Sequence, residues 1–161
     1  MGNCGQIFRL GLATLVLIVA AGMAAATDVC REDQINLRGD WGEARFTVEV
    51  VDDKNERAQG LMHRENLPKS AGMLFVYETP RTVRFWMRDT LIPLDMIFAD
   101  ETGTVRRVHH RAVPLSEKLI PGGKGIQYVL EINGGLAETL NITTGSELRH
   151  PSIGDAAAWP C

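Results

Sequence analysis

The sequence predicts a mainly β (β-rich α+β) fold: one compact, antiparallel, sandwich- or barrel-like domain with two short helices. Six or seven short segments either alternate apolar and polar residues or form short apolar runs, which is typical of strands. Glycine, proline and aspartate separate these segments, as expected for turns between neighbouring strands. The sequence lacks the helices of 10–15 residues that a doubly wound α/β fold needs between successive strands.

The first half of the predicted domain combines strands with one helix. Residues 45–51 alternate apolar and polar side chains, which predicts a half-buried strand. Asp53 suits a helix N-cap and is followed three positions later by a glutamate, so a short helix begins there and ends near Arg64. Apolar or alternating patterns then predict strands over 73–77 and 83–88.

The second half is predicted to contain three strands, a long loop, a short helix and a final short strand. In order, these elements cover 94–99, 104–113, the loop 114–125, the strand 126–132, the helix that follows Gly134, and 147–149. The loop holds two prolines and three glycines, residues that interrupt a strand ladder.

Length and charge limit the functions that this chain can have. A chain of 161 residues with 45% hydrophobic residues is long enough for one domain with its own core, which argues against a disordered protein. Its 17 basic and 20 acidic residues give a net charge of -3. Because nucleic-acid-binding domains usually carry clustered basic charge, nucleic acid is not an expected partner.

Residues 1–26 have the pattern of a secretory signal peptide. Arg9 is the only charged residue in this segment, and the apolar run that follows ends in three alanines at 24–26. Cleavage after Ala26 predicts a periplasmic or secreted protein. The alternative is an uncleaved membrane anchor, because the apolar run is close to the shortest length that can span a bilayer. The membrane is expected as a partner only through this segment.

The segments that flank a predicted core at 44–149 are interpreted as tails. The N-terminal tail covers 27–43 and the C-terminal tail covers 150–161. Cys30 lies in the first tail and Cys161 ends the second, and these are the two cysteines that remain after signal removal. An oxidising compartment favours a disulfide between them, and two free thiols on separate tails are the alternative.

The densest group of chemically versatile side chains lies between residues 84 and 98. Period-two alternation places an aromatic ring and two guanidinium groups on one face of the predicted strand, with a threonine and two aspartates nearby: Arg84, Trp86, Arg88, Asp89, Thr90 and Asp95. Arginine binds carboxylates and phosphates through paired hydrogen bonds, and a Trp face stacks on a sugar or another ring. This pattern is compatible with a ligand site. Charged side chains on a strand usually serve the local fold, so the favoured interpretation is that Arg84 or Arg88 pairs with Asp89 or Asp95 and stabilises the hairpin.

The order of short motifs along the chain resembles the prokaryotic domain-of-unknown-function family numbered 192. These motifs are Glu56-Arg57, Gly60-Leu61-Met62 with Arg64, Gly72-Met73-Leu74-Phe75, Phe85-Trp86-Met87 with Thr90, Pro93-Leu94-Asp95 with Phe98, and Tyr128-Val129-Leu130-Glu131-Ile132-Asn133 with Gly135. The likeness spans about residues 44–149. It implies a compact, mainly β, sandwich-like domain that is exported or membrane-anchored, in a family without an established activity. Asp89 stands where the family usually has asparagine.

Three further charged residues extend the predicted polar site. Arg57 and Arg64 are seven residues apart, so both project from one side of the predicted helix. Glu131 alternates away from the apolar face of its strand. Two interpretations fit these groups equally well. They line one polar site with Arg84, Arg88 and Asp95, or they form ion pairs that fix the helix to the sheet.

Two functions fit these observations. The first is a non-catalytic binding or accessory module of the cell envelope that contacts a small anionic ligand, a glycan or an envelope protein. The second is a hydrolase in which Asp95 and Glu131 form an acid/base pair. The histidines lack metal-ligand spacing and the methionines lie in apolar runs, so neither a metal nor another cofactor is expected.

Overall fold

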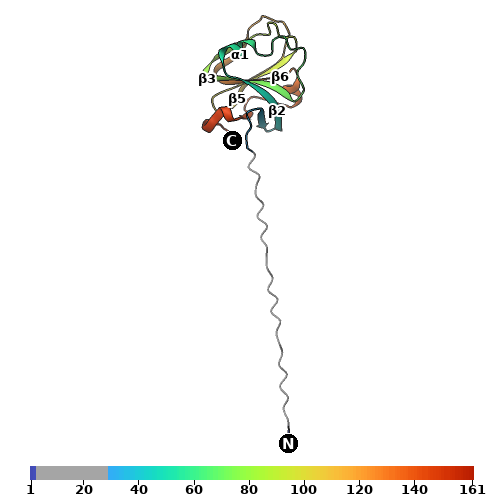
Figure 1. The fold of residues 1–161 in the computed structure, drawn as a ribbon, viewed down its shortest axis with the longest axis vertical. Coiled ribbons are helices and arrows are strands. Elements are labelled where there is room, and N and C mark those ends of the chain that lie inside the picture. The colour runs from blue at the N-terminus through green and yellow to red at the C-terminus, as the bar shows by residue number, and fades with distance from the viewer. Residues whose placement is uncertain (3–28) are drawn as a thin grey trace.

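A computed structural model describes residues 1–2 and 29–161, and the predicted signal peptide falls almost entirely outside this range. The described chain forms one curled seven-stranded sheet, a half-barrel, in the order β5-β4-β6-β3-β2-β1-β7 (Figure 1). Its strands are β1 (Gln34–Gly39), β2 (Gly42–Val51), β3 (Ala71–Phe85), β4 (Leu94–Ala99), β5 (Val105–Ala112), β6 (Ile120–Asn133) and β7 (Glu147–Arg149). The short helices are α1 (Lys54–Gln59), α2 (Leu136–Thr139) and the 3-10 helix η1 (Pro151–Ala156). The predicted mainly β class is therefore confirmed.

Both faces of the sheet carry an apolar core, because successive side chains of a strand point to opposite faces. On one face, Leu74, Leu130 and Ile97 belong to a cluster that α2, β7 and η1 cover. On the other face, Met73 and Met96 belong to a second cluster, which continues along β3 toward its end. The second face is the one that α1 adjoins, since Leu61, two residues after the end of the helix, is buried there.

The strand pairing is antiparallel except between β2 and β3, which run parallel. Parallel neighbours need a crossover connection, and α1 lies in that connection. The helix begins as predicted, since the Asp53 side chain accepts hydrogen bonds from the amides of Asn55 and Glu56. The expected end near Arg64 is wrong, because the helix ends at Gln59 and Gly60 follows with φ 50°.

Two predicted strands are one in the structure. The segments 73–77 and 83–88 both fall in or beside β3, which pairs with β6 along most of its length through three register shifts. β-Bulges of this kind let a strand continue past residues that break regular pairing. For the same reason the loop expected at 114–125 is wrong in its second part, where β6 begins at Ile120. A Cβ at Gly122 would lie 2.4 Å from Phe98 and Val83, so the glycine permits this close packing.

The segments expected to be tails take part in the fold. Within 27–43, β1 pairs with β2 and β7, and its Ile35 and Leu37 are fully buried. Within 150–161, η1 buries Ile153 against the first core cluster. The prediction that both segments are irregular tails is therefore wrong, because their apolar residues pair with or pack against residues that are distant in the sequence.

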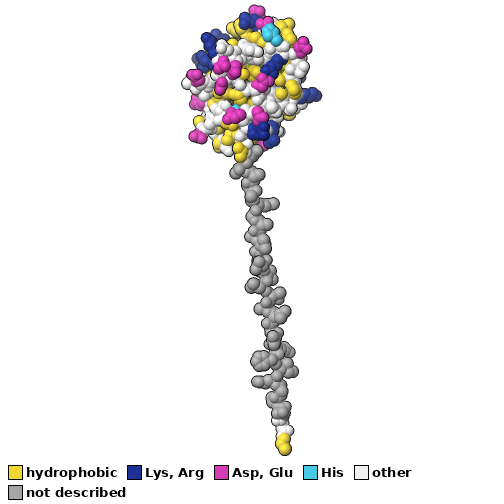
Figure 2. Space-filling model, viewed as in Figure 1, with side chains coloured by type: hydrophobic (Ala, Val, Ile, Leu, Met, Phe, Trp, Pro, Cys, Tyr) yellow, Lys and Arg dark blue, Asp and Glu magenta, His cyan; other side chains and the backbone are white. Residues whose placement is uncertain are grey.

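Cys30 and Cys161 form a disulfide with a Cα–Cα distance of 5.6 Å. The C-terminus consequently lies beside the beginning of the domain, at the end opposite α1 (Figure 1). Acidic and basic side chains are interspersed over the face that Figure 2 shows. Among the described residues, no helix is long and apolar enough to cross a membrane.

Candidate functional site

A cavity of about 200 Å³ lies where α1 approaches the end of β3, and it contains most of the predicted site residues. We call it the arginine pocket and define it by its polar and charged lining together with one exposed aromatic side chain: Arg57, Gln59, Tyr77, Arg84, Trp86, Arg88, Thr90 and Glu131. Phe75, Phe85, Leu61 and Met62 supply apolar walls. The pocket thus combines three guanidinium groups with aromatic surface.

Four parts of the chain place these side chains. Arg57 comes from α1, Tyr77 and Arg84 come from β3, and Glu131 comes from β6. Trp86 follows β3 directly. The expectation that Trp86 and Arg88 share a strand face with Arg84 is wrong, because β3 ends at Phe85. The turn that follows still brings all three side chains to the pocket.

The rim of the pocket is exposed and cationic. Arg88 lies over the Trp86 ring, with its guanidinium carbon 4.1 Å from the ring centre, and Trp86 is 39% exposed. The side chain of Arg84 is exposed and makes no hydrogen bond or ion pair with the described residues. Arg57 is held more firmly, since it donates to the Val76 carbonyl at 2.9 Å and to the Asp52 carbonyl, and it contacts the Tyr77 ring.

Glu131 occupies the buried part of the pocket. It is 4% exposed, lies between Met73 and Met96 in the sheet, and makes no hydrogen bond or ion pair with the described residues. Burial raises the pKa of Glu131 to about 8, because a desolvated carboxylate is unfavourable without a partner. Burial also raises the pKa of Tyr77. Both side chains are therefore protonated in most molecules at neutral pH.

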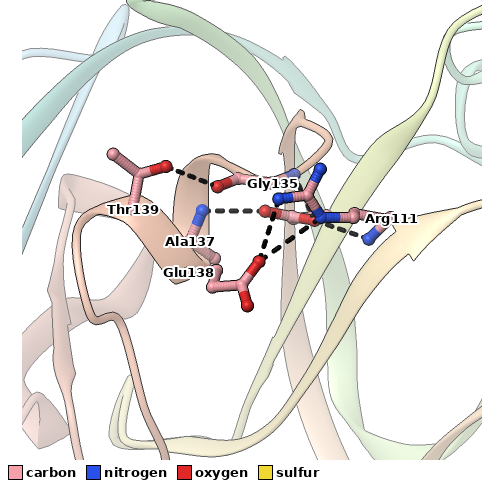
Figure 3. Close-up of polar contacts among 6 residues, drawn as sticks. Arg111, Gly135, Ala137, Glu138 and Thr139 are labelled. Carbon is pink, nitrogen blue, oxygen red and sulfur yellow. Dashed lines mark hydrogen bonds and ion pairs between the residues drawn. The ribbon is translucent and has the colours of Figure 1, made fainter.

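Asp95 has a structural position outside the pocket. Its fully buried carboxylate accepts hydrogen bonds from the backbone amides of Arg111 at 2.7 Å, Gly135 at 2.9 Å and Ala137 at 2.7 Å. These donors come from the end of β5 and the start of α2, and Figure 3 shows them beside the exposed Arg111–Glu138 ion pair. The carboxylate thus joins two chain segments to β4.

The sheet register also separates the two carboxylates that were predicted as an acid/base pair. Asp95 is paired with Ile132, and Glu131 is paired with Met96. Directly paired residues point to the same face and adjacent residues point to opposite faces, so Asp95 and Glu131 lie on opposite faces of the sheet. The predicted pair is therefore wrong.

Two other predicted residues lie beside the pocket rather than in it. Arg64 follows α1 and binds Glu49 through two hydrogen bonds, one of them 2.6 Å long, in a neighbouring cavity. Asp89 forms the turn after β3 with φ 55°, a left-handed conformation that aspartate and asparagine tolerate better than most residues. Its carbonyl accepts from the His63 amide at 2.8 Å, and its carboxylate lies 3.7 Å from Arg88. Part of the alternative reading, local ion pairing, thus holds for Arg64 and Arg88.

Tyr77 is a lining residue that the sequence analysis did not predict. It ends the apolar run 73–77, which indicated only a strand. Its ring packs against the second core cluster and also contacts both Arg57 and Arg81. The period-two pattern Met73, Phe75, Tyr77 does place it on the face that Glu131 shares, so this signal was present in the sequence. In the described part of the chain, no cluster of three or more His, Cys, Asp or Glu side chains has the geometry of a metal site.

Comparisons with known proteins identify the family. Residues 35–150 match the model of the family DUF192, described as "Uncharacterized ACR". A crystal structure of a protein of unknown function from Novosphingobium aromaticivorans DSM 12444 is 38% identical, with a TM-score of 0.70 over 71% of this chain and 82% of that one. A crystal structure from Sinorhizobium meliloti 1021, described as "a putative transcription regulator", is also 38% identical, with a TM-score of 0.71 over 74% of this chain and 93% of that one.

None of the curated proteins searched matches the chain. The family model covers more than two thirds of the sequence, and the motifs around Trp86 and Glu131 lie within the matched residues. Together with the likeness of the two solved structures, this match shows that the chain belongs to the DUF192 family.

Proposed function

We propose that this chain is an exported, non-catalytic binding module whose arginine pocket takes a small organic anion. The observation that carries the proposal is the pocket itself, in which three guanidinium groups from α1, β3 and the turn after β3 meet around aromatic surface. Arginine is suited to this role because its planar group binds carboxylates, sulfonates and phosphates through parallel hydrogen bonds.

The state of the arginines supports a ligand rather than internal ion pairing. Arg84 has no ion pair with the described residues, and the Arg88–Asp89 pair is long at 3.7 Å between exposed groups. Exposed pairs of this kind contribute about 0–1 kcal/mol to stability, so an anion competes readily for these guanidinium groups. Trp86 adds a ring face at the rim for an apolar or aromatic part of the ligand.

The size of the pocket favours a small ligand among the three partners considered. A volume of about 200 Å³ is below the roughly 300–1,000 Å³ of sites that enclose drug-sized molecules. A small anion, or the acidic terminal group of a larger glycan or envelope protein, fits this volume. The transcription-regulator description given for the Sinorhizobium structure is not favoured for this chain, because its acidic residues outnumber its basic ones and clustered basic charge is the footprint of DNA binding.

Export is supported by the N-terminal pattern and by the disulfide. Disulfides persist in oxidising compartments, which agrees with the predicted signal peptide at 1–26. Mass spectrometry of the protein recovered from outside the cytoplasm is expected to find Thr27, or a residue within two positions of it, at the N-terminus. Full-length protein retained in the membrane would support the uncleaved anchor instead.

A thermal-shift panel tests the binding function. Any ligand that binds the native state raises its melting temperature, so small carboxylates, sulfonates and phosphates are compared at equal ionic strength. At least one is expected to stabilise the protein, and Arg84→Gln is expected to remove that shift. Arg64→Gln is the matched control, since it removes the same charge from the neighbouring cavity. A panel without any stabilising anion, or an equal loss of the shift in both variants, would refute the proposal.

A further inference from the structure

The buried carboxyl of Glu131 is the part of the arginine pocket that simple anion binding leaves unexplained. Glu131 is 4% exposed and makes no hydrogen bond to the described residues, whereas no fully buried side-chain oxygen among them lacks a partner, so the unpaired Glu131 carboxyl reaches the open space of the pocket. Its side chain opens onto the pocket together with the arginines. A group in this position is available to a ligand that enters the pocket.

The titratable and charged groups near Glu131 belong to several elements. The cavity that Glu131 lines is also lined by Arg57 of α1, by Tyr77 and Arg84 of β3 and by Arg88 of the turn after β3, and Tyr77 interacts electrostatically with Glu131. On β2, Glu49 is occupied by Arg64 in the neighbouring cavity. On β4 the adjacent residue is Met96, and the next residue in that row, His109 of β5, lines a different cavity. Glu131 is thus the one acidic side chain among the described residues that line the pocket.

The protonation state of Glu131 decides whether it repels a bound anion or donates a hydrogen bond to it. As a carboxylate it would repel the ligand and would have no donor of its own. As a neutral acid it offers an O–H donor, and hydrogen bonds from such a donor to an oxyanion are short and strong. Desolvation favours the neutral acid here, with a pKa of about 8. The Tyr77 hydroxyl, whose pKa is also raised, is a second neutral donor in the same pocket.

We propose that Glu131 donates a hydrogen bond to the bound oxyanion in its protonated form, so that the pocket binds a small organic anion and a proton together. This inference rests on the proposed anion-binding function and adds to it that anion binding is coupled to protonation of Glu131. The process is an association without a covalent step: one anion and, when Glu131 is ionised, one proton enter the complex. The ligand class is a small sulfonate or carboxylate whose charged group reaches the buried part of the pocket and whose apolar part contacts the aromatic walls.

Calorimetry with benzenesulfonate as the probe tests the coupling. This anion stays ionised throughout the range used, so any proton exchange belongs to the protein. The disulfide-bonded protein is titrated in two amine buffers of different ionisation enthalpy. The uptake is expected to approach one proton per ligand at pH 9 and zero at pH 6. The affinity is expected to be about tenfold weaker at pH 9 than at pH 7, because Glu131 in the unliganded protein has a pKa of about 8 and must take up a proton to bind at pH 9.

Glu131→Gln keeps a neutral donor and is expected to bind benzenesulfonate without proton uptake and with equal affinity at pH 7 and 9. Glu49→Gln is the matched control on the same face and is expected to behave as the wild type. Binding of benzenesulfonate by the wild type without proton uptake at pH 9 would overturn the coupling and leave the binding function intact. Failure of every anion in the thermal-shift panel would overturn the binding function as well. The wild-type measurement decides the question even where Glu131→Gln does not fold.

Discussion

Asp95→Asn is expected to destabilise the protein strongly, although it replaces only one heavy atom of the side chain. The carboxylate accepts three backbone N–H groups, two at one oxygen and one at the other. An asparagine keeps a single acceptor oxygen and turns its NH2 group toward at least one of these donors. One buried N–H is then unsatisfied, which costs about 1–3 kcal/mol. The two remaining hydrogen bonds lose their charge, at about 1 kcal/mol each.

The expected loss in the free energy of unfolding is therefore about 3–5 kcal/mol, a large share of the roughly 5–15 kcal/mol that stabilises a typical domain. Urea denaturation of the oxidised protein at pH 7 measures it. Glu138→Gln is the control, because it breaks the exposed ion pair with Arg111 in the same region and is expected to cost less than about 1 kcal/mol. A cost for Asp95→Asn as small as that of the control would refute the structural role assigned to this carboxylate.

Three further predictions concern stability. Burial raises the pKa of Glu131 from 4.5 to about 8, so the folded protein keeps a proton that the unfolded chain has released. The stability from this site is complete below pH 4.5 and is lost as pH rises to 8, by up to about 1.4 kcal/mol per unit. The free energy of unfolding of Glu131→Gln, measured with urea, should therefore rise relative to that of the wild type between pH 5 and pH 8. A difference between the two proteins that stays constant over this range would contradict the prediction. Cys30→Ser opens a loop of 131 residues, and thermal unfolding should show a loss approaching 4–5 kcal/mol in the chain-entropy model, reduced where the ends stay docked. An unchanged melting temperature would show that docking alone holds the termini. Because Trp86 is 39% exposed, Trp86→Ala should lower the free energy of unfolding by about 1–2 kcal/mol and remove ligand-induced stabilisation. Phe98→Ala in the core should lower the free energy of unfolding by about 3–5 kcal/mol. Equal costs for the two variants would make Trp86 a core residue.

Local patterns were sufficient for much of the fold. Alternation of apolar and polar residues identified β2, and the short apolar run at 94–99 identified β4, because burial on one or both faces of a sheet leaves a direct trace in the residue order. The Asp53 cap was equally readable, since its partners lie two and three residues away. The same patterns were less informative for β1, whose short apolar stretch becomes a strand only through pairing with β2 and β7.

The sequence likewise predicted only part of the candidate site. The sequence indicated that Arg84, Trp86 and Arg88 act together, because they are neighbours along the chain and one turn suffices to gather them. It also placed Glu131 on the less apolar face of its strand. It did not reveal that this carboxyl lacks a partner, since that depends on where α1 and β3 direct their arginines.

Asp95 shows most clearly what only the tertiary structure decided. From the sequence it was a carboxylate in an apolar segment, a pattern that a catalytic acid and a structural anchor share. Its partners are backbone amides 16 to 42 residues away, and every residue except proline carries such an amide, so no side-chain pattern marks them. The sequence alone determined the mainly β class, several of the strands and the family likeness. The sheet register decided that Asp95 and Glu131 lie on opposite faces, because a one-residue difference in pairing sends a side chain to the other side of a sheet.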